Sequence, residues 1–591
     1  MVPATRFLDP VREISDSEVM PIHNNDLADV FSELADLQEI RGDNPFRVRA
    51  YRNAARLCGD HGEPLREAVA RGDDLTAISG IGKELAEKIR EIVTTGKLGA
   101  LEKIRGEFPP DVTKMLNLQG LGPKRVKTLL EELQINTLAD LEQAAKDGRV
   151  RKLPGFGAKI EATLLASIER KGGEVQRFLR PRVRETAEAL VAYLEASGTL
   201  SRITPAGSFR RGRETIGDLD VLAVATGMPT AAMDAFAGFD DVDRVLAKGE
   251  TKSSVVLRNG LQVDLRIVPE ESYGAALHYF TGSQAHNIAM RRRAQQQDLK
   301  LNEYGVFRGE ETVAGASEED VFKALGLPWI APELREDRGE LDAAEAGRLP
   351  ELITAADIRG DLHNHTTWSD GEADLLDMAE AAKGRGWEYL AITDHSKRLT
   401  VANGLDEARL RKQIEEIDRI NAGLDGFTLL KGSEVDLLED GSLDLDDEVL
   451  GLLDVVILSV HSKFNLSRDK QTERILRALD HPKVTFVAHP TGRLLLTREP
   501  YEVDVDRVLE GIKQRGCFVE LNLNPLRLDL NDVQLRMAKD AGILVVANSD
   551  AHSPRDFDHH YDGILQARRG WLEPKDVLNT RSLSELRRLL P

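Results

Sequence analysis

The sequence predicts a multidomain fold with helical domains at the N-terminus, an α+β unit in the middle and a β/α unit at the C-terminus. Apolar residues recur at three- and four-residue spacing from about residue 24 to 175, which is the period of amphipathic helices. Residues 185–325 shift toward strands, and from about residue 355 apolar β runs alternate with helical stretches. A chain of 591 residues has room for about three to five domains.

The composition is that of a globular protein, with 41% hydrophobic and 30% charged residues. No apolar run approaches the ~18 residues of a membrane helix, and the N-terminus lacks the basic start and apolar core of a signal peptide. Cys58 and Cys517 lie far apart in the sequence, which argues against a disulfide framework. We therefore expect a cytoplasmic protein without a membrane partner.

The net charge of −21, taken alone, argues against nucleic acid, because phosphate contacts need Lys and Arg. The charge is uneven, however. Residues 41–56 hold five arginines against one acid, residues 146–185 hold eleven Lys or Arg against five acids, and residues 436–454 hold eight acids and no base. A solvated face is the ordinary explanation of each run taken singly. Together they place basic charge in the N-terminal half and leave acids in the C-terminal half to serve as metal ligands.

An internal repeat occupies the helical part. Its copies begin at residues 75, 116 and 151 and read LTAISGIGKELAEKI, LNLQGLGPKRVKTLL and RKLPGFGAKIEATLL. Two glycines let the backbone turn tightly, and the following helix start offers free N–H groups to an anion. One Gly-x-Gly is more often a helix cap, but three copies in register resemble helix-hairpin-helix motifs, which grip the DNA backbone. The glycine pairs are Gly80 and Gly82, Gly120 and Gly122, and Gly155 and Gly157.

Three carboxylates define a candidate site in the α+β unit. Asp218 and Asp220 lie two residues apart in a predicted strand, so they face the same side. Asp264, in the neighbouring strand-like run VDLRIV, is placed to join them. Because three carboxylates aimed at one point repel each other, we expect divalent cations between them, as two-metal phosphoryl transfer requires. One cation would activate a 3′-hydroxyl and the other would hold a triphosphate.

The motif GSFRRG precedes the aspartate pair. Gly207 and Ser208, before a predicted helix, would cradle the phosphates, and Arg211 would add positive charge. An Asp-x-Asp pair alone is typical of a solvated strand edge. The occurrence of GSFRRG, the Asp-x-Asp pair and VDLR in this order along the chain favours a catalytic site.

Residues 24–320 resemble the family X DNA polymerases, since YFTGSQAHN and LNEYGVF follow these motifs. The resemblance implies that Asp218, Asp220 and Asp264 bind the catalytic Mg²⁺ ions. Gln284 departs from the mammalian polymerase beta type, which has Asp there, so the expected nucleotide contacts differ at this position. The other implied contacts are the phosphate site (Ser208, Arg211, Gly217), the incoming sugar and base (Tyr279, Phe280, Gly282, Asn287) and the template side (Arg291).

The N-terminal part resembles the small DNA-end-binding domain of the same family, through RVRAYRNAA and the first glycine hairpin. In polymerase beta a lysine after that hairpin forms a Schiff base with an abasic sugar. Lys88 falls on that position and Tyr51 on a supporting tyrosine, whereas Glu84 replaces a basic residue. Because a nucleophilic lysine must be partly neutral, two interpretations stay open: lyase chemistry at Lys88, or contact of Lys88 with phosphate or water alone.

Seven strand-like runs follow residue 355, and six of them end in possible metal ligands. Active sites of β/α barrels lie at the carboxyl ends of the strands, and imidazole and carboxylate suit Zn²⁺ and Mn²⁺. A lone histidine at a strand end is more often capped or part of the core. That explanation does not account for nine possible ligands that recur at strand ends. The nine are His363, His365, Asp370, His395, Glu434, His461, His489, Asp550 and His552.

The remaining residues of this region fit the pattern less well. The sixth run holds Glu520 but no histidine at its end. His481, His559 and His560 lie outside the pattern, and an ordinary structural role is expected for them. Since a tetrahedral site takes four ligands, three ions that share Glu434 would use all nine. Such a cluster binds a phosphate diester and activates water.

Residues 355–591 resemble the polymerase and histidinol phosphatase (PHP) domain, with each ligand motif intact. The resemblance implies a distorted (β/α)₇ barrel. In bacterial family X polymerases this domain is similar to a Mn²⁺-dependent 3′–5′ exonuclease, and some members cut at abasic sites. Arg493, just after His489, either holds a phosphate or is surface charge. The implied ion sites are His363, His365, Glu434 and Asp550; Glu434, His461 and His489; and Asp370, His395 and His552.

The expected organisation follows from these assignments. It comprises a tail (1–20), a DNA-end-binding helical domain (21–105), a fingers-like domain with two further hairpins (106–185), a palm (186–270), a thumb-like domain (271–330), a polar linker (331–354) and the PHP domain (355–591).

The sequence favours a monomeric bacterial repair polymerase with its own 3′-processing nuclease, acting on DNA gaps or ends with dNTPs in the nucleoid. Two alternatives stay open. One is a DNA-end-binding scaffold with silent sites, against which the intact ligand sets argue. The other is a small-molecule phosphoesterase, such as a histidinol phosphatase, fused to a polymerase fold. The three hairpins favour DNA, because a small molecule needs no backbone grip.

Overall fold

A computed structural model describes residues 22, 24–59, 65–78, 80–116, 118, 121–158, 160–161, 164–165, 168 and 176–591. The chain divides into two compact units, Met1–Arg170 and Lys171–Pro591. The tail expected at residues 1–20 lies outside the described residues, as does Gly120. Of the helices in the described ranges, none combines the length and apolar character needed to cross a bilayer.

The first unit consists of helices around one apolar core. Local signals explain where they begin and end. Gly82 and Gly122 precede α4 and α7 in an extended conformation, and Gly96 ends α4 with a left-handed φ of 71°. Thr137 and Asp140 form a capping box at the start of α8. The described helices are α1 (Asn24–Arg41), α2 (Pro45–Gly59), α3 (Leu65–Arg71), α4 (Lys83–Thr95), α5 (Gly99–Arg105), α6 (Val112–Leu116), α7 (Pro123–Leu133) and α8 (Leu138–Lys146).

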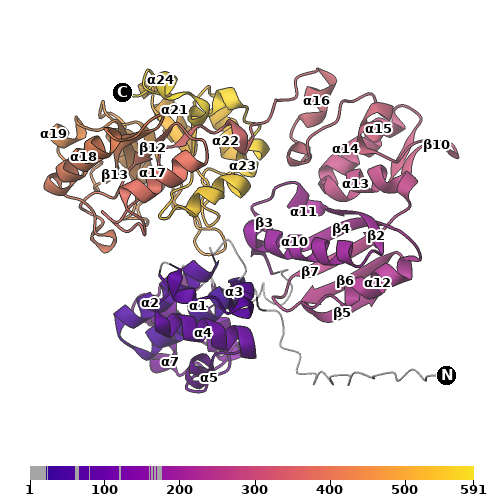
Figure 1. The fold of residues 1–591 in the computed structure, drawn as a ribbon, viewed down its shortest axis with the longest axis horizontal. Coiled ribbons are helices and arrows are strands. Elements are labelled where there is room, and N and C mark those ends of the chain that lie inside the picture. Colours follow the sequence, from indigo (N-terminus) through magenta and orange to yellow (C-terminus); the bar gives the residue numbers. More distant parts are fainter. Residues whose placement is uncertain are drawn as a thin grey trace, which may run out of the picture. The chain divides into compact units, whose positions relative to one another are not determined.

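A five-stranded mixed sheet begins the second unit (Figure 1). Strands β4 and β7 run parallel, and the other neighbours pair antiparallel. One face packs on α10 (Arg180–Ala196) and α12 (Pro229–Ala237). A short pair, β1 (Phe178–Leu179) and β3 (Thr215–Ile216), flanks α11 (Gly207–Arg210) in sequence. In spatial order the sheet holds β2 (Leu200–Pro205), β4 (Asp218–Ala225), β7 (Gln262–Ile267), β6 (Lys252–Leu257) and β5 (Val242–Lys248).

The opposite face of this sheet packs on α13 (Tyr273–Thr281), the first helix of the thumb-like part. Ser283 caps the next helix, α14, by accepting a hydrogen bond from the backbone of His286. A three-stranded antiparallel sheet follows. The elements after α13 are α14 (Gln284–Gln295), β8 (Lys300–Asn302), β9 (Gly305–Arg308), β10 (Glu311–Ala314) and α15 (Glu318–Ala324).

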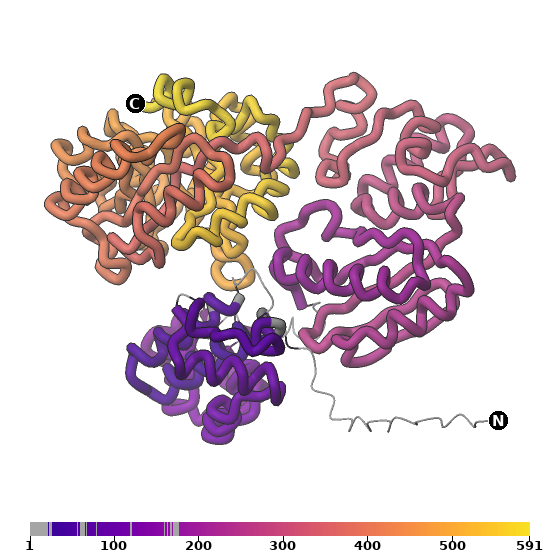
Figure 2. Tube along the Cα trace, in the orientation of Figure 1, coloured from indigo at the N-terminus to yellow at the C-terminus, as the bar shows by residue number. Residues whose placement is uncertain are grey.

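Residues 331–352, expected to be a polar linker, are folded instead. They contain a short 3₁₀ turn (Pro332–Leu334) and helix α16 (Glu340–Glu345). Leu334 and Ala344 join an apolar cluster with Trp571 from the C-terminal part. Arg335 is fully buried, and its charge is compensated by an ion pair with Glu318. The polar sequence therefore conceals paired charges, and the chain passes through this packed segment into the barrel (Figure 2).

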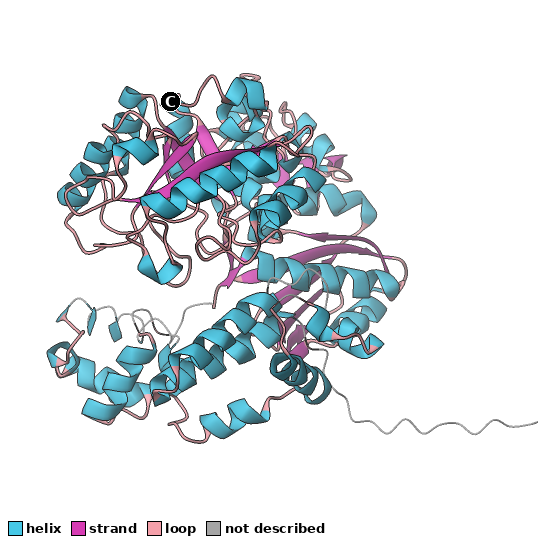
Figure 3. Ribbon diagram, turned by 60° about the vertical axis from the view of Figure 1, so that its left-hand side comes forward, coloured by secondary structure: helices cyan, strands magenta, loops and turns pink. Residues whose placement is uncertain are grey.

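The C-terminal part is a parallel seven-stranded sheet in sequential order. A bridge between Asn364 and Ala551 links its first and last strand ends, so the sheet nearly closes. Apolar side chains fill the interior, and a second apolar layer lies under the helices. Figure 3 shows helices packed around the strands of this part. This confirms the predicted distorted (β/α)₇ barrel. Its strands are β11 (Gly360–Asp361), β12 (Tyr389–Ile392), β13 (Thr428–Asp436), β14 (Val455–Ser459), β15 (Phe486–Val487), β16 (Phe518–Asn522) and β17 (Val545–Asn548).

The helices of the barrel follow the same alternation along the chain. Each long helix has a polar N-cap or a glycine end that explains its limits, such as Asp374 before α17 and Gly516 after α21. The helices are α17 (Leu375–Gly384), α18 (Glu407–Asn421), α19 (Asp447–Leu450), α20 (Arg468–Ala478), α21 (Val505–Arg515), α22 (Asp532–Asp540), α23 (His559–Arg569) and α24 (Leu583–Leu586).

The buried charge at Arg335 gives a stability test. Glu318 bonds both Arg335 and Arg210, the latter at 2.8 Å through each nitrogen, and lies almost fully buried. Glu318→Ala leaves two arginines without their counter-charge, so we expect it to destabilise this part of the chain by about 3–5 kcal/mol. Glu319→Ala, on the exposed side of the same helix, should stay within about 0.5 kcal/mol. Urea unfolding of the full chain measures both, and equal losses would contradict the role of the buried pair.

Candidate metal centres

Three carboxylates lie on two adjacent strands of the mixed sheet. The parallel register of β4 and β7 sets Asp220 opposite Asp264. Asp218 precedes Asp220 by two residues, so both side chains point to the same face. That face packs against α13, since Leu222 and Val224 continue the alternation into the apolar cluster there.

The three carboxylates lie close enough together for their negative charges to repel each other. Burial, together with repulsion from Asp218 and Asp264, raises the pKa of Asp220 to about 6. Burial also favours the neutral form of Asp264, but hydrogen bonds from Lys252 and Gln262, each at 3.0 Å, lower the pKa of this group. A divalent cation between the carboxylates would remove the repulsion. Oxygen ligands of this kind fit Mg²⁺.

The loop before the carboxylates depends on glycine at its first position. Gly207 has a φ of +60°, and a Cβ there would lie 2.6 Å from Asp220 Oδ2. Ser208 follows within α11, and Gly217 immediately precedes β4. A side chain at position 207 would displace the carboxylate, so the close approach of loop and strand requires this glycine.

Arg211, expected to contact phosphates, is held by protein groups. Its Nε donates to Glu336 at 3.0 Å and its NH1 to the carbonyl of Thr281 at 2.8 Å. Burial lowers the pKa of the guanidinium, and the Glu336 carboxylate opposes that shift. The orientation of the Arg211 side chain is therefore set by these two partners.

The turn between α13 and α14 brings together the side chains expected around a nucleotide. Tyr279 and Phe280 end α13 with their rings 5.1 Å apart. Asn287 donates to the carbonyls of Tyr279 and Gly282, at 2.7 and 3.2 Å. Arg291 lies with its guanidinium 5.8 Å from the Tyr279 ring. The amide of Asn287 thus locks this turn.

The described glycines of the hairpin repeat occupy tight turns. Gly80 and Gly155 have φ of +87° and +78°. Gly82 and Gly122 precede helix starts, and no described atom lies within 4 Å of a Cβ built on either, or on Gly157. These open positions leave room for a partner to approach the backbone at the helix starts.

Lys88 forms an ion pair rather than a free amine. Its Nζ lies 2.8 Å from Glu84 Oε1, which also accepts a hydrogen bond from the Tyr51 hydroxyl at 3.2 Å. Burial favours the neutral amine, but the hydrogen bond that Lys88 donates to Glu84, together with the nearby charges of Glu84 and Tyr51, raises the pKa of Lys88. The replacement of a basic residue by Glu84 thus opposes the neutral state that a Schiff base requires.

The barrel gathers its ligands at one mouth. Parallel strands place their carboxyl ends on the same side of a barrel, and the loops there converge on a buried centre. The nine side chains are His363, His365 and Asp370 after β11, His395 after β12, Glu434 within β13, His461 after β14, His489 after β15, and Asp550 and His552 after β17.

Glu434 is the centre of this cluster. Its Oε2 lies 2.8 Å from His395 Nδ1 and 3.4 Å from His363 Nε2. Its Oε1 lies 3.0 Å from His489 Nε2 and 3.3 Å from His461 Nε2. One buried carboxylate therefore reaches imidazoles that come from four other strand ends.

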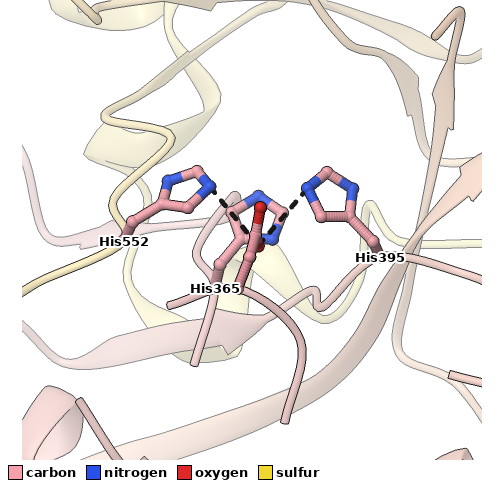
Figure 4. Close-up of side chains that lie close together, drawn as sticks. His365, His395 and His552 are labelled. Atoms are coloured by element: carbon pink, nitrogen blue, oxygen red, sulfur yellow. Dashed lines mark ion pairs between the residues drawn. The ribbon is translucent and has the colours of Figure 1, made fainter. Parts of the chain in front are cut away.

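The other ligands surround His365. Its Nε2 lies 3.3 Å from Asp550 Oδ1, and its ring centroid lies 4.3 Å from that of His395 and 4.4 Å from that of His552 (Figure 4). Asp370 Oδ1 lies 3.6 Å from Nε2 of both flanking histidines. The side chains thus form overlapping groups of donors close enough to share ions.

The donor atoms fit metal ions. In the described part of the chain, His363 Nε2 and both ring nitrogens of His365 are buried without a hydrogen-bond partner. Each such atom costs about 1–3 kcal/mol unless something binds it. Imidazole nitrogens mixed with carboxylate oxygens suit Zn²⁺ or Mn²⁺.

Comparison with known proteins covers almost the whole chain. Family models match a helix-hairpin-helix domain at residues 22–98, a SAM-like helix-hairpin-helix tandem at 112–170, a DNA polymerase beta thumb at 276–336 and a PHP domain at 361–524. The DNA polymerase/3′-5′ exonuclease PolX of Bacillus subtilis is 39% identical over 96% of this chain and 99% of its own length. The chain belongs to the PHP-containing family X DNA polymerases.

Two other relatives match parts of this family X polymerase. DNA polymerase lambda of Arabidopsis thaliana is 26% identical over 53% of the chain and 62% of its own length. A probable phosphatase of Thermoanaerobacter sp. strain X514 is 28% identical over 37% of the chain and 89% of its own length.

The structure also gives roles to residues that sequence reasoning missed. Glu520 Oε1 lies 2.7 Å from His363 Nδ1, and its Oε2 accepts the backbone N–H of His489 at 2.6 Å. Asp436 lies 3.3 Å from His461 Nδ1. These carboxylates orient the rings of His363 and His461. The sixth strand run did carry Glu520, but its lack of a terminal histidine gave no sign of this role.

The side chains expected to stand apart do so. His560 pairs with buried Asp361 at 2.8 Å, and His559 contacts the carbonyl of Ser549 at 3.1 Å. His481 lies near exposed Asp447.

Arg493 is bound by Glu214 of the palm at 2.8 Å, so it is neither a free surface charge nor open to a phosphate.

Glu434 should control how many ions the barrel holds. Because it reaches ligands of several groups, we expect Glu434→Gln to lower the Mn²⁺ content of the purified chain and the thermal midpoint of the barrel. Metal bound at about 100 times its Kd contributes about 2.7 kcal/mol. Elemental analysis after chelation and reloading measures the content. Glu439→Gln makes the same chemical change at an exposed position beyond the cluster and should keep wild-type content; equal loss in both variants would contradict the central role.

Proposed function

We propose that this chain is a gap-filling, DNA-directed DNA polymerase with a metal-dependent 3′–5′ exonuclease in its PHP barrel. The observation that carries the proposal is that one chain holds two separate clusters of candidate ligands: three carboxylates on β4 and β7, and nine side chains at the barrel mouth. The printed function of the Bacillus subtilis relative, polymerase and 3′-5′ exonuclease, supports it.

In the polymerase site, Asp218, Asp220 and Asp264 would hold Mg²⁺, which neutralises phosphate charge and lowers the pKa of a bound 3′-hydroxyl. The glycine at 207 lets the loop approach within contact of Asp220. Ser208 and Gly217 would offer groups to the triphosphate of a dNTP. The remaining contacts proposed for the sugar, base and template are Tyr279, Phe280, Gly282, Asn287 and Arg291.

In the barrel, three Mn²⁺ or Zn²⁺ ions would occupy the nine ligands, and they supply a hydroxide and hold the phosphate diester when bound. Glu520 and Asp436 hold ring nitrogens so that the opposite nitrogens face the centre. The same donors would permit cleavage at abasic sites. We propose three sets: His363, His365, Glu434 and Asp550; Glu434, His461 and His489; and Asp370, His395 and His552.

The substrate class follows from the rest of the chain. The open helix starts at Gly82 and Gly122 would hold the DNA backbone, and the polymerase beta thumb match supports a primer and template. We propose a monomer that works in the bacterial cytoplasm at the nucleoid. The barrel resembles probable phosphatases. The alternative of a DNA-end-binding protein with a small-molecule phosphoesterase is nevertheless not favoured, because the relative that matches 96% of the chain is a polymerase with an exonuclease.

Substitution should separate the two activities. Asp220→Asn should reduce nucleotide incorporation at a one-nucleotide gap by about 10³-fold or more, because a cation ligand is lost, and leave Mn²⁺-dependent 3′ digestion intact. His363→Ala should do the reverse. Gel assays on labelled gapped DNA measure both. Loss of both activities in either variant would refute two independent sites, and faster hydrolysis of histidinol phosphate than of a DNA 3′ end would favour the phosphoesterase.

Lyase chemistry at Lys88 has its own test. Since Glu84 raises the pKa of the amine, we expect weak borohydride trapping of the wild type on abasic DNA. Glu84→Gln should increase trapping and Lys88→Ala should abolish it. Equal trapping by Lys88→Ala and the wild type would show that another amine reacts.

A further inference from the structure

Helix α23 of the PHP barrel packs against the palm loop that leads into the catalytic carboxylates. Both lie in the same compact unit. A Cβ on Gly212, whose φ is +68°, would lie 3.1 Å from Leu565 Cβ. Two residues farther along this loop, Glu214 accepts a hydrogen bond from Gln566 at 3.1 Å. The barrel therefore touches the loop over its length from Gly212 to Glu214.

Arg569, at the end of α23, ties three segments together. Its NH1 donates to the carbonyl of Arg211 and to Glu336 Oε1, both at 2.9 Å, and its NH2 donates to Asp532 at 2.6 Å. The side chain is 2% exposed. Because a guanidinium is planar and its donors are fixed in direction, these bonds set the palm loop, the segment after the thumb and α22 relative to one another.

Glu336 carries this constraint to the side chain of Arg211. Its Oε1, which accepts a hydrogen bond from Arg569, also accepts one from Arg211 Nε at 3.0 Å. Arg211 also donates its backbone N–H to Gly207 at 3.3 Å and its NH1 to Thr281. Loss of Arg569 would release the Arg211 carbonyl and leave the Glu336 carboxylate to Arg211 alone. Both changes act on the loop that begins at Gly207.

We propose that Arg569 is a positioning residue for nucleotide binding in the polymerase site, although it belongs to the PHP domain. It holds the phosphate loop through the Arg211 carbonyl and Glu336, and it contacts neither the nucleotide nor the reacting atoms. The inference rests on the proposed polymerase function. It means that the barrel completes the nucleotide site of the palm in addition to its own chemistry.

Docking of the barrel does not depend on Arg569 alone. Arg568 bonds Glu333 at 2.7 Å and the carbonyl of Ile353 at 3.0 Å. Asp562 pairs with Arg184 at 2.9 Å. Since Arg568 joins the same helix to the segment after the thumb without bonding the loop, it is the matched control.

The experiment measures single-nucleotide incorporation at a one-nucleotide gap in the full-length chain with Mg²⁺. Arg569→Gln should raise the KM for dNTP about tenfold, equivalent to about 1.4 kcal/mol, with kcat within about twofold of wild type. Arg569→Lys should raise KM less, because an ammonium keeps the charge but not the planar fork. Arg568→Gln should keep the wild-type KM. All three should retain Mn²⁺-dependent 3′ digestion, which reports an intact barrel.

The outcomes separate the possibilities. A wild-type KM in Arg569→Gln with digestion retained overturns the inference, as does an equal rise in Arg568→Gln, which would show a docking effect. If Arg569→Gln loses digestion too, Arg569→Lys decides: a raised KM with digestion retained supports the role, and an unchanged KM overturns it. Absence of incorporation by the wild type would refute the proposed function itself, and this inference with it.

Discussion

The arrangement of polar side chains at the mouth of the barrel depends on one buried carboxylate. Glu434 lies within β13 and is reached by imidazoles from four other strand ends. A charge in such a place is costly unless it is paired or coordinates a metal. The strand backbone fixes its position, so the parallel register of the sheet sets the geometry of the ligands around it. The apolar interior of the barrel thus supports a polar mouth, where a bound cation would compensate the charge of Glu434.

The same need for charge compensation shapes the boundary between palm and barrel. Buried or half-buried ion pairs recur there: Asp562 with Arg180 and Arg184, Glu214 with Arg493, and Glu336 with Arg211 and Arg569. Breaking one such pair leaves an uncompensated charge, which makes alternative packings of the two parts unfavourable. The loop between Gly207 and Asp218 lies at the centre of this boundary. This loop leads into the carboxylates of the mixed sheet and packs on α23, whose first residue, His559, contacts Ser549 beside the barrel cluster.

Much of both candidate sites could be predicted because their signals are local. The two-residue spacing of Asp218 and Asp220 follows from the pleat of a strand, and the ligands of the barrel recur at strand ends in sequence order. Lys88 could be located by the resemblance to polymerase beta, but its ion pair with Glu84 appears only in the folded structure. The folded state of residues 331–352 was missed, because Arg335 is polar in the sequence and buried only through its pairing with Glu318.

Spacing within single strands and motifs was enough to predict the order of domains, the three carboxylates and the nine candidate ligands of the barrel. What holds these side chains in place depends on contacts between distant parts of the chain. Glu520 orients His363 from 157 residues away, and Arg569 reaches the Arg211 carbonyl across 358 residues. Such contacts carry no local period or motif. They arise when strands and helices distant in sequence pack together, and the burial of their charges then dictates which partners must meet.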